Sequence, residues 1–164
     1  MEIRPERPAD AVAIGHVTTA AFETAPHSSG TEARIVDGLR AAGALTVSLV
    51  AVEKGDVVGH VACSPVTIAG AEGAWYGLGP VSVRPDLQGR GVGRSLIRAG
   101  LEQLRALQAA GCVVLGEPGY YGRFGFGSDP ALTWGGEPSP YFQRLVLAGP
   151  PASGDVAYHP AFEA

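Results

Sequence analysis

A glycine-rich stretch joins a strand-like run to a helix-like run at residues 88–94, QGRGVGR. Before it, apolar and polar residues alternate from Val81, and Pro85 with Asp86 closes the run, which is typical of a strand ending in a turn. After it, apolar residues recur at helical spacing up to Leu107, with charged residues on the opposite face. A strand, a glycine turn and a helix in direct succession predict an α/β fold. The first turn of such a helix offers unpaired N–H groups that attract phosphate.

The spacing of the glycines discriminates between three kinds of phosphate-binding loop. A Walker loop needs a lysine after its last glycine, whereas the only lysine of the chain is Lys54 in another segment. A dinucleotide-binding loop needs a third glycine, but Arg94 stands at that position. What remains is the pattern Gln-x-x-Gly-x-Gly at Gln88, Gly91 and Gly93. An NTP- or NAD-binding domain is therefore the least favoured alternative.

A second motif follows the helix. Residues 112–116 form a short apolar run typical of a buried strand, and residues 117–126 read EPGYYGRFGF. Tyr121 lies four residues before the glycine of a Gly-Phe pair. With this motif and the glycine-rich loop, the chain resembles the GNAT superfamily of N-acetyltransferases, in which the loop holds the pyrophosphate of acetyl-CoA and a Tyr precedes a Gly-Phe pair. The matching segments cover residues 78–126, about a third of the chain.

The resemblance implies a fold, a reaction and a cosubstrate. It implies a single domain over residues 1–164, with a mixed, mostly antiparallel sheet of about six to seven strands flanked by helices. It also implies an enzyme that moves an acetyl group from acetyl-CoA to a primary amine by direct attack. The residues expected to bind acetyl-CoA are Val81, Ser82, Val83, Gln88, Gly89, Arg90, Gly91, Val92, Gly93 and Arg94. A noncatalytic acyl-CoA-binding module that acts with a protein partner is the alternative.

Acetyl transfer needs donors for the oxyanion and an acid for the departing thiolate. The resemblance places main-chain N–H groups of residues 81–83 beside the thioester, on a strand splayed from its neighbour, and assigns Tyr121 as the general acid. A phenol has a reference pKa of about 10 and a thiol one of about 8.5. Tyr121 therefore stays protonated at neutral pH and can donate to sulfur. A binding module has no need of this phenol.

The general base is open between three candidates. Glu117 follows the apolar run and is the first, as a catalytic carboxylate. His60 is the second candidate, because it begins a strand and faces the site in one of the two possible registers. The third is water, which can carry the ammonium proton to solvent without a dedicated residue. The candidates for contact with CoA phosphates are three arginines of a kind that is usually exposed to solvent, Arg90, Arg94 and Arg123.

The acceptor amine is not specified by any motif. In the resembled family the acceptor pocket is shaped by the loop between the first two helices and by the C-terminal strands, here residues 25–30 and 135–143. These segments contain His27, Tyr141 and Phe142 but a single carboxylate. A small amine, an amino-acid derivative, a protein N-terminus or a lysine amine therefore remains open as the acceptor.

The composition is that of an ordinary globular chain, with 164 residues, 46% apolar residues and a formal charge of −4. This charge indicates no nucleic-acid partner. Apolar runs stay well short of the ~20 residues of a membrane span, and the first residues lack a signal-peptide core, so we expect no membrane association and a cytoplasmic location. Cys63 and Cys112 lie in apolar runs without a CxxC pair, which predicts buried free thiols and no metal site. A homodimer stays open.

The rest of the chain predicts short elements in a defined order. Residues 54–56, Lys-Gly-Asp, are a hairpin-turn signal between two apolar runs. Strands are expected at residues 2–4, 48–53, 57–68, 74–83, 132–135 and 141–147, helices at 8–22 and 31–42, and a loop at 149–154.

Overall fold

The structure, a computed structural model, describes residues 1–26 and 28–163, which cluster into two compact units. Unit 1 takes the described residues within 1–64, 79–103 and 160–164, and unit 2 those within 65–78 and 104–159. Two strands pass from one unit into the other, β3 (Asp56–Ile68) and β4 (Trp75–Val83).

The other elements follow the predicted order closely. The helices are α1 (Ala11–Phe22), α2 (Glu32–Ala41), α3 (Val92–Ala106) and α4 (Pro118–Tyr121), with short 3-10 turns at Pro8–Asp10, Pro85–Leu87, Gly122–Phe124 and Pro160–Glu163. The remaining strands are β1 (Glu2–Pro5), β2 (Val47–Glu53), β5 (Gly111–Leu115), β6 (Gly127–Ser128), β7 (Leu132–Trp134), β8 (Phe142–Val146) and β9 (Gly154–Ala157).

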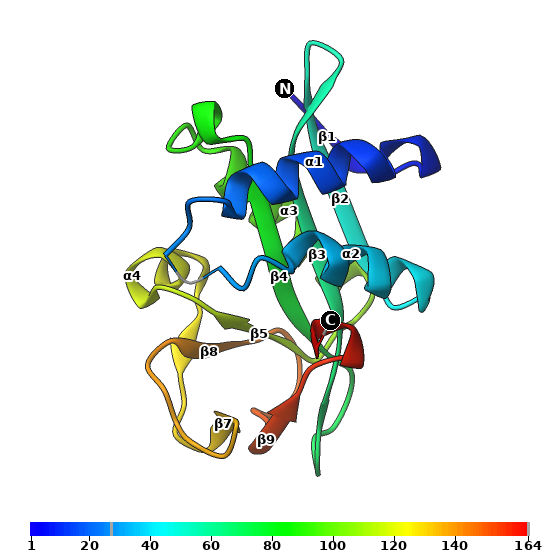
Figure 1. Cartoon of the computed structure of the whole chain (residues 1–164). Coiled ribbons are helices and arrows are strands. Elements are labelled where there is room, and N and C mark those ends of the chain that lie inside the picture. Colours follow the sequence, from blue (N-terminus) through cyan, green and yellow to red (C-terminus); the bar gives the residue numbers. More distant parts are fainter. Residues whose placement is uncertain (27, 164) are drawn as a thin grey trace. The chain divides into compact units, whose positions relative to one another are not determined.

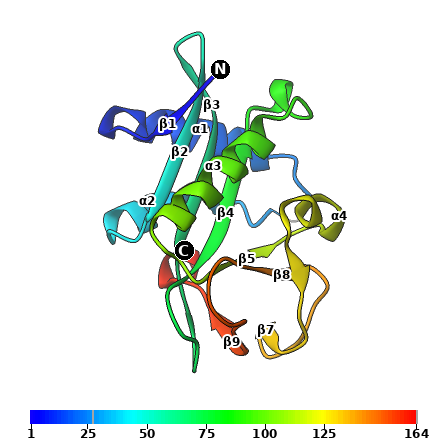
Figure 2. The same ribbon diagram turned by 180° about the vertical axis from the view of Figure 1, so that it is seen from behind.

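Unit 1 is a layered α/β structure. β1, β2 and β3 pair antiparallel in that order. Helices α1 and α2 cover one face of these strands, as Figure 1 shows, and the view from behind in Figure 2 shows α3 on the opposite face. On the α1 and α2 face, Ile14, Val36 and Val50 form a buried cluster. Toward α3, a Cβ on Gly59 would lie 2.9 Å from Leu96, so only glycine lets the helix pack this close.

The predicted hairpin turn between β2 and β3 is confirmed. Lys54 and Gly55 both adopt left-handed backbone angles, with φ of 50° and 82°. Two consecutive positive φ values match the twist of the flanking strands, which is why this turn favours glycine at its second position. The ladder closes at the pair Glu53 and Asp56.

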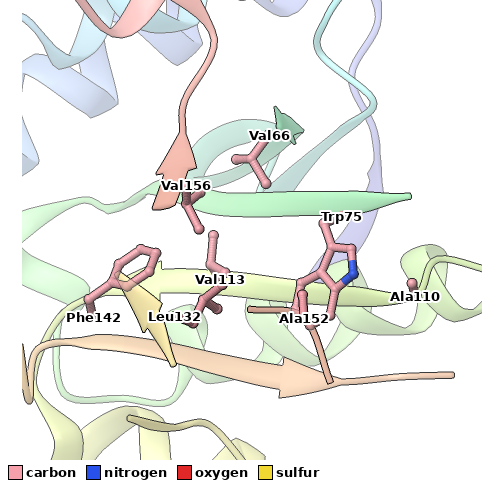
Figure 3. Packing of buried hydrophobic residues seen from close by; sticks show 8 residues of the cluster. All are labelled: Val66, Trp75, Ala110, Val113, Leu132, Phe142, Ala152 and Val156. Carbon is pink, nitrogen blue, oxygen red and sulfur yellow. The ribbon is translucent and has the colours of Figure 1, made fainter. Parts of the chain in front are cut away.

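Unit 2 is built around the first half of β4. Residues Trp75–Gly77 pair in parallel with Gly111–Val113 of β5, β5 pairs antiparallel with β8, and β8 with β6. β9 pairs in parallel with β7 and antiparallel with the end of β3. Figure 3 shows the core of this unit. Its buried members are Val66, Trp75, Ala110, Val113, Leu132, Phe142, Ala152 and Val156.

The predicted α/β class with a mixed sheet is confirmed, and most of the strand pairings described above are antiparallel. The described residues form nine strands, more than the predicted six to seven. β6 has two residues, and β9 begins at Gly154 with Val156 as its one buried member, so neither is long enough to show an alternating pattern. Because β9 begins at Gly154, the loop predicted over residues 149–154 ends one residue earlier than expected. That residues 1–164 form a single domain stays a prediction.

Candidate functional site

The glycine-rich loop of unit 1 presents main-chain groups to solvent. Gly89 and Gly91 have left-handed φ values of 79° and 87°, and apart from the chain neighbours no atom lies within 4 Å of the position of a Cβ at either. The first hydrogen bond of α3 runs from the Ser95 N–H to the Gly91 carbonyl, at 3.0 Å. The N–H groups of residues 92–94 come before it and have no intrahelical acceptor. The loop thus combines an open backbone with free donors at the positive end of a helix, as anion binding requires.

Gln88 holds this loop to the end of β4. Its side-chain amide Nε2 donates to the Val83 carbonyl at 3.1 Å. The side chain is otherwise exposed. Gln88 therefore fixes the backbone that leads into Gly89, and whether it also contacts a ligand stays a prediction.

The three predicted strand residues alternate in their surroundings. Ser82 is buried, and its hydroxyl donates to the Thr18 hydroxyl of α1 at 3.2 Å. Val81 and Val83 are half-buried and, by strand alternation, face the other side. Because the Ser82 side chain is occupied by Thr18, only its main-chain atoms are left for a ligand.

The arginines differ between the units. In unit 1, Arg90 and Arg94 have exposed side chains on and beside the loop. In unit 2, the Arg123 guanidinium lies over the Tyr120 ring, 4.7 Å from its centroid. Arg123 is therefore engaged in a cation–π contact, which makes it a weaker candidate for a phosphate than the two loop arginines.

Tyr121 lies at the end of α4 in an aromatic cluster of unit 2. Its ring centroid is 5.1 Å from that of Tyr120 and 5.9 Å from that of Phe126, both in edge-to-face geometry, and 6.3 Å from that of Phe124. Burial, with smaller contributions from Tyr120 and Cys112, raises the pKa of the Tyr121 phenol to about 12. The phenol is therefore protonated at neutral pH, which a proton donor must be.

Glu117 precedes α4 and is exposed. Its main-chain carbonyl accepts the N–H groups of Tyr120 and Tyr121, at 3.1 and 3.0 Å, while its carboxylate caps nothing. The structure thus brings Glu117 and Tyr121 into one short helical turn of unit 2, with the carboxylate free to meet solvent.

His60 lies in the interior of unit 1. It is 0% exposed, and its Nε2 is 2.8 Å from the Ser48 hydroxyl. That hydroxyl donates to the Glu6 carboxylate, which also accepts two hydrogen bonds from Arg40, at 2.8 and 2.9 Å. With Ser48 donating to Glu6, Nε2 must carry the His60 proton. Nδ1 then keeps a buried lone pair with no partner among the described residues.

This environment argues against His60 as the base. Burial lowers the pKa of the imidazole to about 4, while Glu6 raises it and Arg40 lowers it. A neutral, fully buried imidazole has no route to an exposed amine. Sequence analysis missed the partners because Glu6 and Arg40 are 34 residues apart, and no local spacing relates them.

The structure changes which residues of the expected acceptor segments are available to a ligand. His27 lies outside the described residues. Tyr141 is 52% exposed, whereas Phe142 is 2% exposed and belongs to the core of unit 2, which corrects its assignment as a pocket residue. At the start of α2, Glu32 accepts hydrogen bonds from the Ser28 hydroxyl and the Ser29 N–H, at 2.9 and 3.0 Å. Although burial raises its pKa, hydrogen bonds from the backbone and both serines lower it overall.

The prediction of buried thiols without a disulfide is confirmed, since Cys63 and Cys112 are both buried and neither forms a disulfide bond. Within residues 1–26 and 28–163, no group of three or more His, Cys, Asp or Glu side chains is arranged to hold a metal ion. No helix in the same residues has the length and apolarity that crossing a membrane needs.

Comparison with known proteins bears directly on this site. Residues 2–128 match the family model described as an acetyltransferase (GNAT) domain. The Escherichia coli protein named uncharacterized N-acetyltransferase YhbS is 38% identical over 171 aligned residues, which cover 99% of this chain and 98% of YhbS. The structure of YhbS with CoA has a TM-score of 0.86 at 36% identity, covering 99% and 92% of the two chains. A GNAT family acetyltransferase from Brucella melitensis, solved with acetyl-CoA, has a TM-score of 0.87 at 55% identity, covering 98% and 97%.

Proposed function

The chain belongs to the GNAT family of acetyltransferases, and from this premise we propose that it acetylates a primary amine by direct attack, with Tyr121 as the general acid. As a family member it is an acetyl-CoA-dependent acyltransferase. The observation that carries the proposal is the half-buried Tyr121 phenol, whose pKa is raised to about 12. Burial keeps this phenol protonated at neutral pH, so it has a proton to donate to the departing thiolate in the transition state.

The loop of unit 1 fits the pyrophosphate of acetyl-CoA. The backbone at Gly89 and Gly91 is open, and the N–H groups of residues 92–94 can donate hydrogen bonds to phosphate oxygens. The relatives from Brucella melitensis and Escherichia coli were solved with acetyl-CoA and CoA, which supports the same ligand here. Arg90 and Arg94 add positive charge near the loop without being needed for its geometry.

Acetyl-CoA supplies the thioester that is broken. The amine nitrogen forms a bond to the carbonyl carbon, the carbon–sulfur bond breaks, and the sulfur takes the proton of the Tyr121 hydroxyl. Main-chain N–H groups of residues 81–83 are proposed to donate to the carbonyl oxygen as it becomes negative. The ammonium proton leaves through water, with Glu117 as the candidate carboxylate that receives it, and the phenolate of Tyr121 regains a proton from solvent.

For the acceptor we propose a primary amine, on a small molecule or at a protein N-terminus or lysine. In the expected acceptor segments, the exposed Glu137 carboxylate and the exposed Tyr141 ring are groups that suit a cation. Glu32, two residues beyond the first segment, adds a carboxylate that is hydrogen-bonded to Ser28 and Ser29. A cytoplasmic location and a homodimer stay predictions.

An acetyl-CoA turnover assay tests the proposal. Free thiol release is measured across pools of amines, and the best acceptor is then used with Tyr121→Phe, which keeps the ring and deletes the proton donor. General acid catalysis typically contributes about 10²–10⁴-fold, so kcat should fall in that range while acetyl-CoA affinity is little changed.

Tyr120→Phe is the matched control, because its ring is held by the Arg123 guanidinium and should keep its place. Near-full turnover of Tyr121→Phe, with chemistry rate-limiting, refutes the acid role. Binding of acetyl-CoA without thiol release for any amine would instead favour the noncatalytic binding module.

A further inference from the structure

Gly116, the residue after β5, lies directly against the Tyr121 ring. A Cβ at Gly116 would be 2.2 Å from Cε2 of Tyr121 and 2.8 Å from Cδ2. Real Cβ atoms do not approach carbon this closely, so the ring occupies the volume of a missing side chain. Gly116 is not among the glycines with a left-handed φ, and its backbone angles make no demand for glycine. We infer that Gly116 is a positioning residue, which sets where the Tyr121 phenol lies.

The backbone of Gly116 is fixed on both sides. Its N–H donates to the Tyr141 carbonyl at 3.0 Å, and its carbonyl accepts the side-chain amide of Gln143, also at 3.0 Å. Gln143 is 1% exposed, so its amide would be left buried without a partner if Gly116 moved. A side chain at Gly116 must therefore displace the ring rather than the strand.

The ring has little room to move without carrying its hydroxyl away. Tyr120 and Phe126 contact it edge-to-face, and Phe126 is 5% exposed in the interior of unit 2. A catalytic group misplaced by about 1 Å can cost on the order of 10²-fold in rate. This inference rests on the proposed role of Tyr121, because it concerns the placement of the same phenol.

Gly122 offers a matched control one residue beyond α4. Its backbone is helical, with φ −56° and ψ −29°, and apart from its two chain neighbours no atom lies within 4 Å of the position of a Cβ. Gly122→Ala therefore adds the same methyl group to the same segment, where only the adjoining residues of the chain are near it.

The first experiment compares kcat and acetyl-CoA affinity of Gly116→Ala and Gly122→Ala. We expect kcat of Gly116→Ala to fall about 10- to 100-fold with unchanged affinity, and Gly122→Ala to behave as wild type. In the Tyr121→Phe background, Gly116→Ala should cost nothing more, because the displaced hydroxyl is already gone. Wild-type turnover of Gly116→Ala, or an equal loss in both backgrounds, overturns the inference.

A second experiment keeps the inference testable apart from catalysis. Urea unfolding of Gly116→Ala, Tyr121→Ala and the double variant forms a cycle that measures the contact itself. We expect Gly116→Ala to destabilise the wild-type protein but not the Tyr121→Ala variant, and the double variant to fold even where Gly116→Ala alone does not. No coupling overturns the inference, whereas full turnover of Tyr121→Phe with strong coupling refutes the acid role and leaves the contact standing.

Discussion

The two units offer a ligand different kinds of chemical group. In unit 1 the candidate groups are main-chain N–H donors, at an open glycine-rich backbone and at the start of α3. In unit 2 they are side chains, the Tyr121 phenol and the Glu117 carboxylate. A main-chain site depends on backbone shape and tolerates changes of neighbouring side chains, whereas a side-chain site is lost with one atom. In unit 1, substitutions that change the backbone should therefore weaken ligand binding more than substitutions of side chains do. In unit 2, the loss of a single side-chain group should be enough to abolish function.

The largest effect that we expect in unit 1 comes from Gly91→Val. A β-branched residue at φ 87° strains the backbone, and its side chain blocks approach to the loop. Acetyl-CoA affinity should weaken about 30- to 100-fold, or about 2–3 kcal/mol by calorimetry.

Gly55→Val is the control for this loss, because Gly55 has φ 82°, equally open surroundings and a place in the β2–β3 hairpin, outside the glycine-rich loop. It should lose comparable stability but no affinity. If Gly91→Val binds acetyl-CoA normally, the loop is not the phosphate site and the contrast between the units fails.

How far the sequence predicts each unit follows from the same difference. The loop and α3 could be predicted because glycine spacing and helical periodicity are local, and α3 begins at the expected Val92. Tyr121 could be singled out only through the resemblance, since an aromatic residue in a short helix has no distinctive period. β9 carries too few residues to show a pattern.

Contacts between distant residues were beyond the sequence. Gly116 appears in the sequence as the end of a strand, and its contact with Tyr121 is visible only when the ring is placed. The sequence places Phe142 in a segment expected to shape the acceptor pocket, whereas the pairing of β8 with β5 puts it in the core of unit 2. The partners of His60 come from three separate segments, and a strand histidine alone does not predict them.

The buried network of unit 1 gives the next largest effect. The folded protein holds His60 neutral, with a pKa of about 4, whereas the unfolded chain takes up a proton near pH 6.5. The unfolded state therefore binds more protons between these values, and the free energy of unfolding falls as pH drops from about 6.5 toward 4. Between pH 7 and pH 5 the loss should be about 2 kcal/mol.

Urea unfolding of His60→Gln at the two pH values checks this expectation. The variant should lose most of the pH dependence, while His16→Gln, on the exposed side of α1, should keep it. A pH dependence unchanged by His60→Gln would mean that the imidazole is not held neutral by its surroundings.

Gln88 sharpens the comparison, because it is a side chain in a main-chain site. The hydrogen bond from its side-chain amide to the Val83 carbonyl fixes the loop. Gln88→Met keeps the length of the side chain and removes the donor, which should weaken acetyl-CoA binding by about 1 kcal/mol, or roughly fivefold. Gln103→Met, on α3, should change nothing. A loss near 100-fold would identify Gln88 as a direct ligand rather than a support of the backbone.

The smallest effect belongs to the loop arginines, and it is the one most able to break the comparison. Arg90 and Arg94 are exposed, and exposed charges contribute little in a high dielectric and less as salt rises. If main-chain donors carry the phosphate site, Arg90→Ala and Arg94→Ala should each weaken acetyl-CoA binding less than about threefold at 0.15 M salt, with the difference shrinking further at 0.3 M. Arg34→Ala, an exposed charge change on α2, corrects for the altered net charge. A loss of tenfold or more that disappears in high salt would make the site depend on side-chain charge, and the distinction between a main-chain unit and a side-chain unit would no longer hold.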